Sequence, residues 1–409
     1  MMTLKHRPQI KAFIWKGIAR SGSKVTGRSF AYSDFEVRRE LKLNHINEIQ
    51  ITVRPLSMVE RFTQQVKAKD ITIVTRQIAT MLSTGMPIIS VLKLVATNQN
   101  KGEMKSILMK LSATIEVGVP LSQALGMTSV HFDPMYRDLV VTGEQTGKLT
   151  DVFERLASHR EKSDQLKSNV VKALIYPSMV VLTALIVCYL MLTLVIPQFE
   201  SIYAGFGADL PWLTKQVLHI SSLSQDYLWV ILLLFFLICL TFKSVNKRST
   251  RFTLLWNQWL LAAPILGKVL GQAAIARFSR TMATSFSAGL PILLCLETAA
   301  RTAGNLYYQK ALERVTTNTA SGMPMYVAMR QCEAFPEMVL QMVMIGEEAG
   351  KLDDMLNKIA DIYEASVESS IDTLGKTLEP LIIIFLGSTV GGLVVAMYLP
   401  IFNLMNVLG

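Results

Sequence analysis

The sequence predicts an all-α membrane protein with two homologous helical bundles of about six helices each, three transmembrane helices and a small N-terminal appendage. Three observations favour this fold: the composition, three long apolar stretches and an internal repeat. Of the 409 residues, 51% are hydrophobic and only 18% are charged, yet the formal net charge is +10. Charge is scarce for a soluble protein. Apolar and basic residues are therefore segregated along the chain, as in a membrane protein with water-facing domains.

Composition also excludes several other classes of protein. Disordered chains have low hydrophobicity, and disulfide scaffolds need more than the four cysteines present here. The cysteines form no CxxC pair, and neither they nor the five histidines show metal-ligand spacing. We therefore expect free thiols, with no metal site and no cofactor.

Three stretches are apolar enough to cross a bilayer. Residues 173–196 contain no charge and make about 36 Å of helix. Residues 227–242 are shorter but intensely apolar, with basic residues just beyond their C-terminal end. In the third stretch, residues 378–401, no charge follows Glu379. No apolar run precedes residue 173, so we expect no cleavable leader.

The distribution of lysine and arginine predicts the orientation of these spans. Residues 1–172 carry 26 Lys and Arg against 15 Asp and Glu, whereas residues 197–226 carry one against three. Short loops rich in basic residues stay in the cytoplasm. The N-terminus and both bundles are therefore expected to be cytoplasmic, with residues 197–226 and the short tail 402–409 on the far side.

An internal repeat appears when the chain is aligned with itself at offsets of 203 and 204 residues. Residues 76–90 match residues 280–294 at seven of fifteen positions, where composition predicts roughly one. Residues 142–152 match residues 345–355 at six of eleven positions. The prolines that bracket the first apolar stretch also recur around the third. The repeating unit is therefore a soluble module of about 100 residues that leads into a membrane helix.

This repeat, together with the spans, predicts the domain organisation. We expect a basic appendage, two bundles and a connecting segment between the second span and the second bundle. Their predicted ranges are 1–68 for the appendage, 69–172 for the first bundle, 243–273 for the cytoplasmic linker and 274–377 for the second bundle.

Apolar residues recur every three or four positions within each module, which indicates amphipathic helices. Helices are expected near residues 71–84, 88–98, 103–117, 121–126, 134–146 and 149–168. Glycine followed by proline two residues later fits a helix that ends at the glycine and a second that starts near the proline. Such hairpin turns are predicted at Gly85 and Pro87 and again at Gly289 and Pro291. The appendage instead contains short β-like stretches, and we expect it to be a small appendage or a flexible arm.

A duplicated GExxGKL motif resembles a phosphate-binding loop. A Walker loop needs four residues between its glycines and a Ser or Thr after the lysine, whereas the motif has three residues and a leucine. The favoured interpretation is a helix that ends at the second glycine, with the glutamate bonded to backbone or to a neighbouring module. The motif is thus a candidate partner contact or a structural corner. Its residues are Gly143, Glu144 and Gly147 in the first copy and Gly346, Glu347 and Gly350 in the second.

No catalytic constellation accompanies these motifs. Adjacent carboxylates such as Glu347 and Glu348 point apart on a helix, and no serine or histidine stands ready to pair with them. The three spans lack Asp, Lys, Arg and His, and their one Glu, Glu379, lies at a boundary, which disfavours an ion pathway. Gly387 and Gly391 form a GxxxG, from which we expect close packing of membrane helices in an oligomer.

The basic surplus has two interpretations. Nucleic acid is one possible partner, but no aromatic-interleaved patch, zinc spacing or recognition helix accompanies the charge. Anionic lipids or an acidic protein are favoured.

Several of these segments together resemble the F family of type II secretion and type IV pilus assembly, the PilC-like and GspF-like inner-membrane platform proteins. The resemblance covers essentially the whole length. The segments that carry it are 13–17, 69–87, both GExxGKL motifs, 173–177 and the Glu379-Pro380 and Pro400-Ile401-Phe402 pairings.

The resemblance implies a bacterial inner-membrane, non-enzymatic platform that forms homo-oligomers. It also implies contact with a cytoplasmic hexameric ATPase, with pilin or pseudopilin, and with other inner-membrane assembly components. A type IV pilus is the first expectation and a type II secretion pseudopilus the second. A small transporter subunit is the rival from a different class, disfavoured by the lack of charge within the spans. An ATPase in its own right is disfavoured by the broken phosphate loop.

Overall fold

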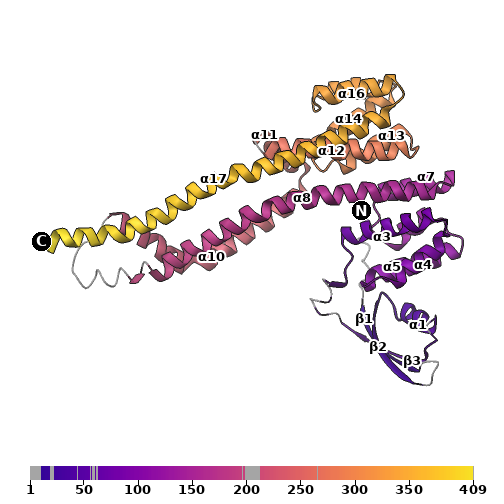
Figure 1. Cartoon of the computed structure of the whole chain (residues 1–409), viewed down its shortest axis with the longest axis horizontal. Coiled ribbons are helices and arrows are strands. Elements are labelled where there is room, and N and C mark those ends of the chain that lie inside the picture. The colour runs from indigo at the N-terminus through magenta and orange to yellow at the C-terminus, as the bar shows by residue number, and fades with distance from the viewer. Residues whose placement is uncertain are drawn as a thin grey trace.

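The structure is a computed structural model, which describes residues 11–18, 23–43, 45–55, 57, 60, 63–195, 197–198, 212–264 and 266–408. It is mostly helical, as predicted. Figure 1 shows two helical bundles side by side at one end of the molecule, with long helices running from both toward the other end. A small sheet lies beside the first bundle.

The N-terminal appendage is a small folded domain with a sheet. The prediction of an all-α protein is therefore wrong here, and so is the alternative of a flexible arm. Three antiparallel strands, β1 (Lys11–Ile18), β2 (Lys24–Ala31) and β3 (Asn47–Arg54), have the order β2-β1-β3, and helix α1 (Asp34–Leu43) packs on them. Phe13 and Val37 are buried in the centre of this small core. Sequence reasoning missed β2 because its exposed and half-buried residues are mostly polar or basic.

Glu103 attaches this sheet domain to the first bundle. Its carboxylate accepts hydrogen bonds from the Tyr32 hydroxyl at 3.1 Å and the Val66 backbone N–H at 2.7 Å, and it lies 3.6 Å from the His131 ring. Although burial opposes ionisation, the hydrogen bonds from His131, Val66 and Tyr32 lower the pKa of Glu103. The carboxylate is therefore a charged joint between the two domains.

The first bundle consists of five short helices and the first part of a long one. The predicted helix ends agree with the structure to within three residues, except at the end of the last helix. Leu92, Ile107 and Leu139 are fully buried in its core. The helices are α3 (Ala68–Ser83), α4 (Ile88–Thr97), α5 (Gly102–Glu116), α6 (Leu121–Thr128), α7 (Pro134–Thr146) and α8 (Leu149–Leu190).

The second bundle repeats this order of helices. Phe278, Leu312 and Leu356 are fully buried, and one continuous cluster of buried side chains runs through both bundles. The helices are α12 (Leu266–Ser287), α13 (Ile292–Thr302), α14 (Leu306–Ala320), α15 (Met325–Gln331), α16 (Glu337–Glu348) and α17 (Leu352–Leu408).

Two helices, α8 and α17, are long and apolar enough to cross a membrane. The predicted boundaries at 172/173 and 377/378 do not interrupt either helix, because neither a glycine cap nor a loop sequence intervenes. Pro177 lies inside α8 without ending it. A short π-helix, Met191–Val195, continues α8.

The region between these two helices differs from the prediction. Residues 227–242 belong to α10 (Trp212–Arg248), which begins within the segment expected to be a loop. Within the described part of α10, the stretch Phe236–Asn246 is apolar but shorter than a membrane span, so the second span stays a prediction. The expected linker 243–273 is largely helical, because α11 (Thr250–Ala262) lies between α10 and α12. A third span arises only if α11 and α12, bent by 112°, count as one.

Candidate functional site: two duplicated polar networks

The hairpin glycines adopt the backbone conformation that their turns require. Gly85 and Gly289 have φ angles of +82° and +87°, which side-chain-bearing residues rarely adopt. Pro87 and Pro291 are the N-cap residues of α4 and α13. In both copies a glycine therefore ends one helix and a proline introduces the next.

The GExxGKL motif of the first copy forms a corner between α7 and α8. Gly147 ends α7 with a φ of +71°. One Glu144 carboxylate oxygen accepts the Leu121 backbone N–H, and the other accepts the Ser122 N–H at 3.2 Å and the Ser122 hydroxyl. The carboxylate thus caps the N-terminus of α6, where free N–H groups and the helix dipole favour negative charge.

The second copy of the motif forms the same corner. Glu347 accepts the backbone N–H groups of Met325 at 2.8 Å and Tyr326 at 3.2 Å, and so caps α15. Gly350 follows α16 with a φ of +66°. These contacts give both motif glutamates a role within their own chain. The exposed residues at the two corners include Gln145, Lys148, Glu348 and Lys351.

The first glycine of each motif allows two helices to approach closely. A Cβ at Gly143 would lie 3.0 Å from Val152 Cγ2, and one at Gly346 would lie 3.0 Å from Leu352 Cα. Both distances are too short for ordinary packing. The glycines of the motif therefore allow close packing and a left-handed turn. A helix leads into each motif, where a phosphate loop has a strand.

A second duplicated network, which sequence reasoning missed, is centred on an arginine in each bundle. Arg76 of α3 donates Nε and Nη2 to the two oxygens of Glu161 at 2.7 and 2.6 Å, and Nη1 to Glu154. These bonds raise the pKa of Arg76, and Arg76 in turn lowers the pKa of Glu161. The bidentate pair fastens α3 to α8.

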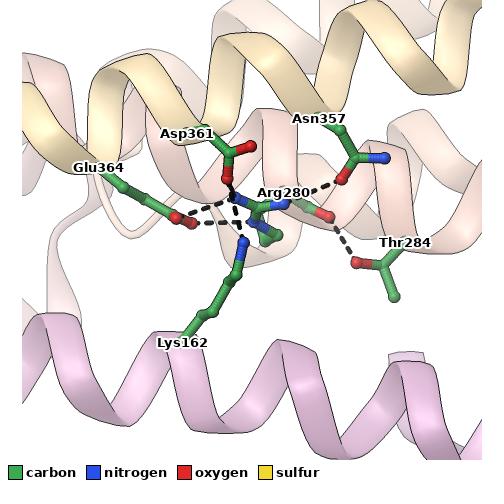
Figure 2. A network of polar contacts seen from close by, with 6 residues as sticks. All are labelled: Lys162, Arg280, Thr284, Asn357, Asp361 and Glu364. Carbon is green, nitrogen blue, oxygen red and sulfur yellow. Dashed lines mark hydrogen bonds and ion pairs between the residues drawn. The ribbon is translucent and has the colours of Figure 1, made fainter.

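Arg280 makes the equivalent pair in the second bundle. Its Nε and Nη2 donate to Glu364 at 2.9 and 2.8 Å. Its Nη1 donates to the Asn357 side chain at 2.9 Å, and Nη2 also reaches Asp361 (Figure 2). Burial opposes the charge, but the bonds to Glu364 and Asp361 raise the pKa of Arg280 overall.

Their positions in the sequence show that the two networks are copies. Arg280 follows Arg76 by 204 residues, and Glu364 follows Glu161 by 203 residues. These are the two offsets of the internal repeat. A search for opposite charges that recur together at the repeat offset would have found both pairs.

The second network extends to the first bundle. Lys162 of α8 donates to Asp361 of α17 at 3.0 Å, as Figure 2 shows. Seven residues further along each helix, Asn169 donates to Glu368 at 2.5 Å. In both contacts the partners are 199 residues apart. The helices α8 and α17 therefore run parallel. Residues in contact are 199 positions apart, which is four fewer than the 203 positions that separate corresponding residues of the repeat in this region.

His159 of α8 lies near this junction. It is half-buried on α8, near the charges of Asp133, Arg160 and Arg280. Desolvation lowers its pKa to about 4. His159 is therefore neutral at physiological pH.

The GxxxG glycines remain without a neighbour in the single chain. Gly387 and Gly391 are exposed on α17, and an added Cβ at either would meet no described atom within 4 Å. Their predicted role in helix packing therefore requires another copy or another protein.

These features define a protein built from a duplicated helical bundle, in which each copy ends in a helix long and apolar enough to cross a membrane. Comparison with known proteins identifies the family. The family model for the protein F of the type II secretion system (T2SS) matches residues 74–197 and again residues 278–400. Because these matches cover more than half of the chain, the chain belongs to the type II secretion system protein F family.

The chain also resembles individual members over most of their length. It is 42% identical to the type IV pilus assembly protein TapC of Aeromonas hydrophila, over 98% of this chain and 97% of the relative. It is 36% identical to the type IV pilus assembly protein PilC of Pseudomonas aeruginosa, over 91% and 100%. It is 30% identical to the type II secretion system protein F of Xanthomonas campestris pv. campestris, over 82% of each.

Proposed function

We propose that the protein is the inner-membrane platform of type IV pilus assembly. One observation carries this choice: the 42% identity to a type IV pilus assembly protein extends over nearly all of both chains. The pseudopilus of a type II secretion system is the second candidate, which the 30% identity to a type II secretion protein F favours.

In this proposal the protein couples a cytoplasmic hexameric ATPase to the insertion or extraction of pilin subunits. The continuous helices α8 and α17 support the coupling. Each connects a bundle core to an apolar segment without a loop, so a displacement of the bundle moves the membrane part of the same helix. The ATPase moves the bundles, and the apolar segments act on pilin.

The chain itself performs no catalysis in this proposal. The only phosphate-loop resemblance is explained by helix capping and close packing. Its proposed partners are the ATPase, pilin, other inner-membrane assembly components, further copies of itself and anionic lipids, with no nucleic acid.

A gene deletion in the source bacterium tests the function. Loss of surface pili that the intact gene restores, with normal export of secreted enzymes, is the expected result. Normal pili together with retained secreted enzymes inside the cell would instead support the type II secretion role. Unchanged pili and secretion would contradict both.

Reporter fusions test the proposed topology, in which both bundles are cytoplasmic and the C-terminus is periplasmic. A reporter that works only in the periplasm should be active after Gly207 and inactive after Gly102 or Asn305. An inactive reporter at Gly207 would contradict the three-span topology.

A further inference from the structure

One side of α11 carries large apolar side chains that the described parts of the chain leave uncovered. Leu255 is 67% exposed and Trp259 is 71% exposed, and Ala262 is also exposed. Intervals of four and three residues place these side chains on one side of the helix. We call Leu255, Trp259 and Ala262 the α11 stripe.

Other side chains of α11 hold the helix in place. Trp256 packs edge-on against Phe242 of α10, with ring centroids 4.9 Å apart, and Phe252 packs against the same ring at 5.8 Å. Leu261 packs against the core of the bundles. Trp259 stacks on Trp256, with ring centroids 6.0 Å apart, and remains 71% exposed. The helix therefore has a fixed inner side, and the stripe lies on the side that the described residues leave exposed.

Contacts between α12 and α17 show where α11 lies along the length of α17. Ser370 donates to Gln272 at 2.9 Å, in the same antiparallel pairing as Arg280 and Asp361. Extending this pairing by six residues on each helix places Leu266, the first residue of α12, across from Lys376. Glu379, the last charge of α17, is three residues or about 5 Å further on.

The end of α11 therefore lies at the level where α17 becomes free of charge. Figure 1 shows α11 at the end of the second bundle from which α17 extends. At its other end α11 follows α10, whose sequence holds the predicted second span, after a single residue.

A broken membrane span formed by α11 and α12 is inconsistent with the packing of α12. Phe278, Met282 and Ala283 of α12 are fully buried in the second bundle, and Arg280 makes its polar network there. Of these two helices, only α11 is therefore available to contact lipid.

We propose that α11 is an interfacial helix that lies on the cytoplasmic leaflet of the membrane and inserts the α11 stripe among the lipid headgroups and upper acyl chains. Tryptophan is favoured at this depth because its ring has an apolar body and a polar N–H. Lys243 is exposed near the end of α10, and the sequence adds Arg248 and Arg251, which suit anionic headgroups. The proposal rests on the proposed topology, with both bundles in the cytoplasm.

This interfacial helix belongs to one copy of the repeat. At the repeat offset of 204 residues, 250–262 correspond to 46–58, which hold β3 of the sheet domain. Among the described residues, the corresponding positions of the first copy form a strand and not a helix.

Fluorescence in lipid vesicles tests the proposal on the full-length protein. In a chain freed of its four cysteines, single cysteines at positions 255, 259 and 262 are labelled with an environment-sensitive dye. The protein is reconstituted into vesicles of phosphatidylethanolamine and phosphatidylglycerol that contain nitroxide-labelled lipid. Glu348→Cys, exposed at the end of α16, is the control.

We expect the nitroxide lipid to quench most of the emission from the three stripe positions, at every protein-to-lipid ratio, while aqueous iodide quenches only the control. Stripe labels that iodide quenches freely would overturn the proposal. Stripe labels shielded from both quenchers, with disulfides between copies, would overturn it in favour of a protein interface.

A pair of substitutions at position 259 adds a second test. Trp259→Glu should abolish lipid quenching at positions 255 and 262, whereas Trp259→Phe should preserve it. Equal quenching in both variants would contradict insertion of the stripe. None of these measurements requires pilus assembly, and the reporter fusion at Gly207 tests the topology separately.

Discussion

Lys162 of α8 and Asp361 of α17 form a salt bridge of 3.0 Å that joins the two bundles, and Asp361 also accepts a bond from Arg280. One carboxylate therefore serves the interior of the second bundle and its contact with the first. Lys162 and Asp361 are both substantially exposed, so this pair by itself stabilises the junction only weakly. The salt bridge matters because it fixes the position of α8 relative to α17.

Replacing Arg280 should cost more stability than replacing Arg76. The Arg280 side chain is 10% exposed and that of Arg76 is 32% exposed. Arg280→Ala leaves the Glu364 carboxylate without its cation, and we expect a loss of about 3 kcal/mol in the free energy of unfolding, against about 1 kcal/mol for Arg76→Ala. Thermal unfolding of the purified variants in detergent measures both. Equal losses would show that the two networks contribute alike.

A disulfide across the junction should form without disturbing the fold. In the chain freed of its own cysteines, Asn169→Cys with Glu368→Cys replaces a direct side-chain contact between α8 and α17. We expect rapid oxidation to an intramolecular bond, visible as a mobility shift on a non-reducing gel. A cysteine pair at 162 and 368 is the matched control, since its members are offset from the observed register. Cross-linking of the control in preference to the 169–368 pair would contradict this register.

His159 should make stability depend on pH between about 6.5 and 4. Its folded pKa is about 4, below the ordinary value of 6.5, so the unfolded chain binds a proton in this range and the folded chain does not. Stability should therefore fall as the pH decreases, by on the order of 1 kcal/mol between pH 7 and pH 5. The measurement is the unfolding midpoint against pH for the wild type and His159→Gln. The variant should show a shallower decline, and identical slopes would exclude this role for His159.

The main role of the capping glutamates should be to stabilise the fold, and not to contact a partner. Glu144→Ala leaves the N–H groups of Leu121 and Ser122 without the carboxylate, which costs about 1 kcal/mol at a helix N-cap. Gln145→Ala, at the exposed neighbouring position, should be neutral. Unfolding and membrane abundance of the two variants provide the comparison.

Charge reversal at the same corner separates the two interpretations of the motif. Glu144→Lys and Glu347→Lys should lower abundance in the membrane, since a lysine cannot accept the backbone bonds. Gln145→Lys changes the surface charge without touching the cap. Normal abundance of Glu144→Lys with loss of pili would instead show that the glutamate contacts a partner.

The sequence predicted the helical bundles well because their local signals agree with the final packing. Gly85 and Pro87 mark a turn whose φ angle only glycine adopts easily, and the buried stripe of α5 recurs at helical spacing. The repeat then transferred the same reasoning to the second bundle.

The features that were missed depend on distant contacts. The strand β2 exposes alternate polar residues and gains its backbone partners only from β1. The Arg76 and Glu161 pair joins residues 85 positions apart, so no local pattern reveals it. Likewise, the sequence showed that Glu144 was notable, but the N–H groups it caps are more than 20 residues away.

The register between α8 and α17 limits the symmetry of the molecule. Facing residues are 199 apart, whereas corresponding residues of the repeat are 203 apart at the same helices. The two copies are therefore displaced by four residues, or about 6 Å, along the direction of their parallel helices. A rotation combined with such a rise is a screw operation, and its repetition generates an ascending spiral that never closes. A ring of these proteins must therefore use contact surfaces other than the one that joins the two halves of each chain.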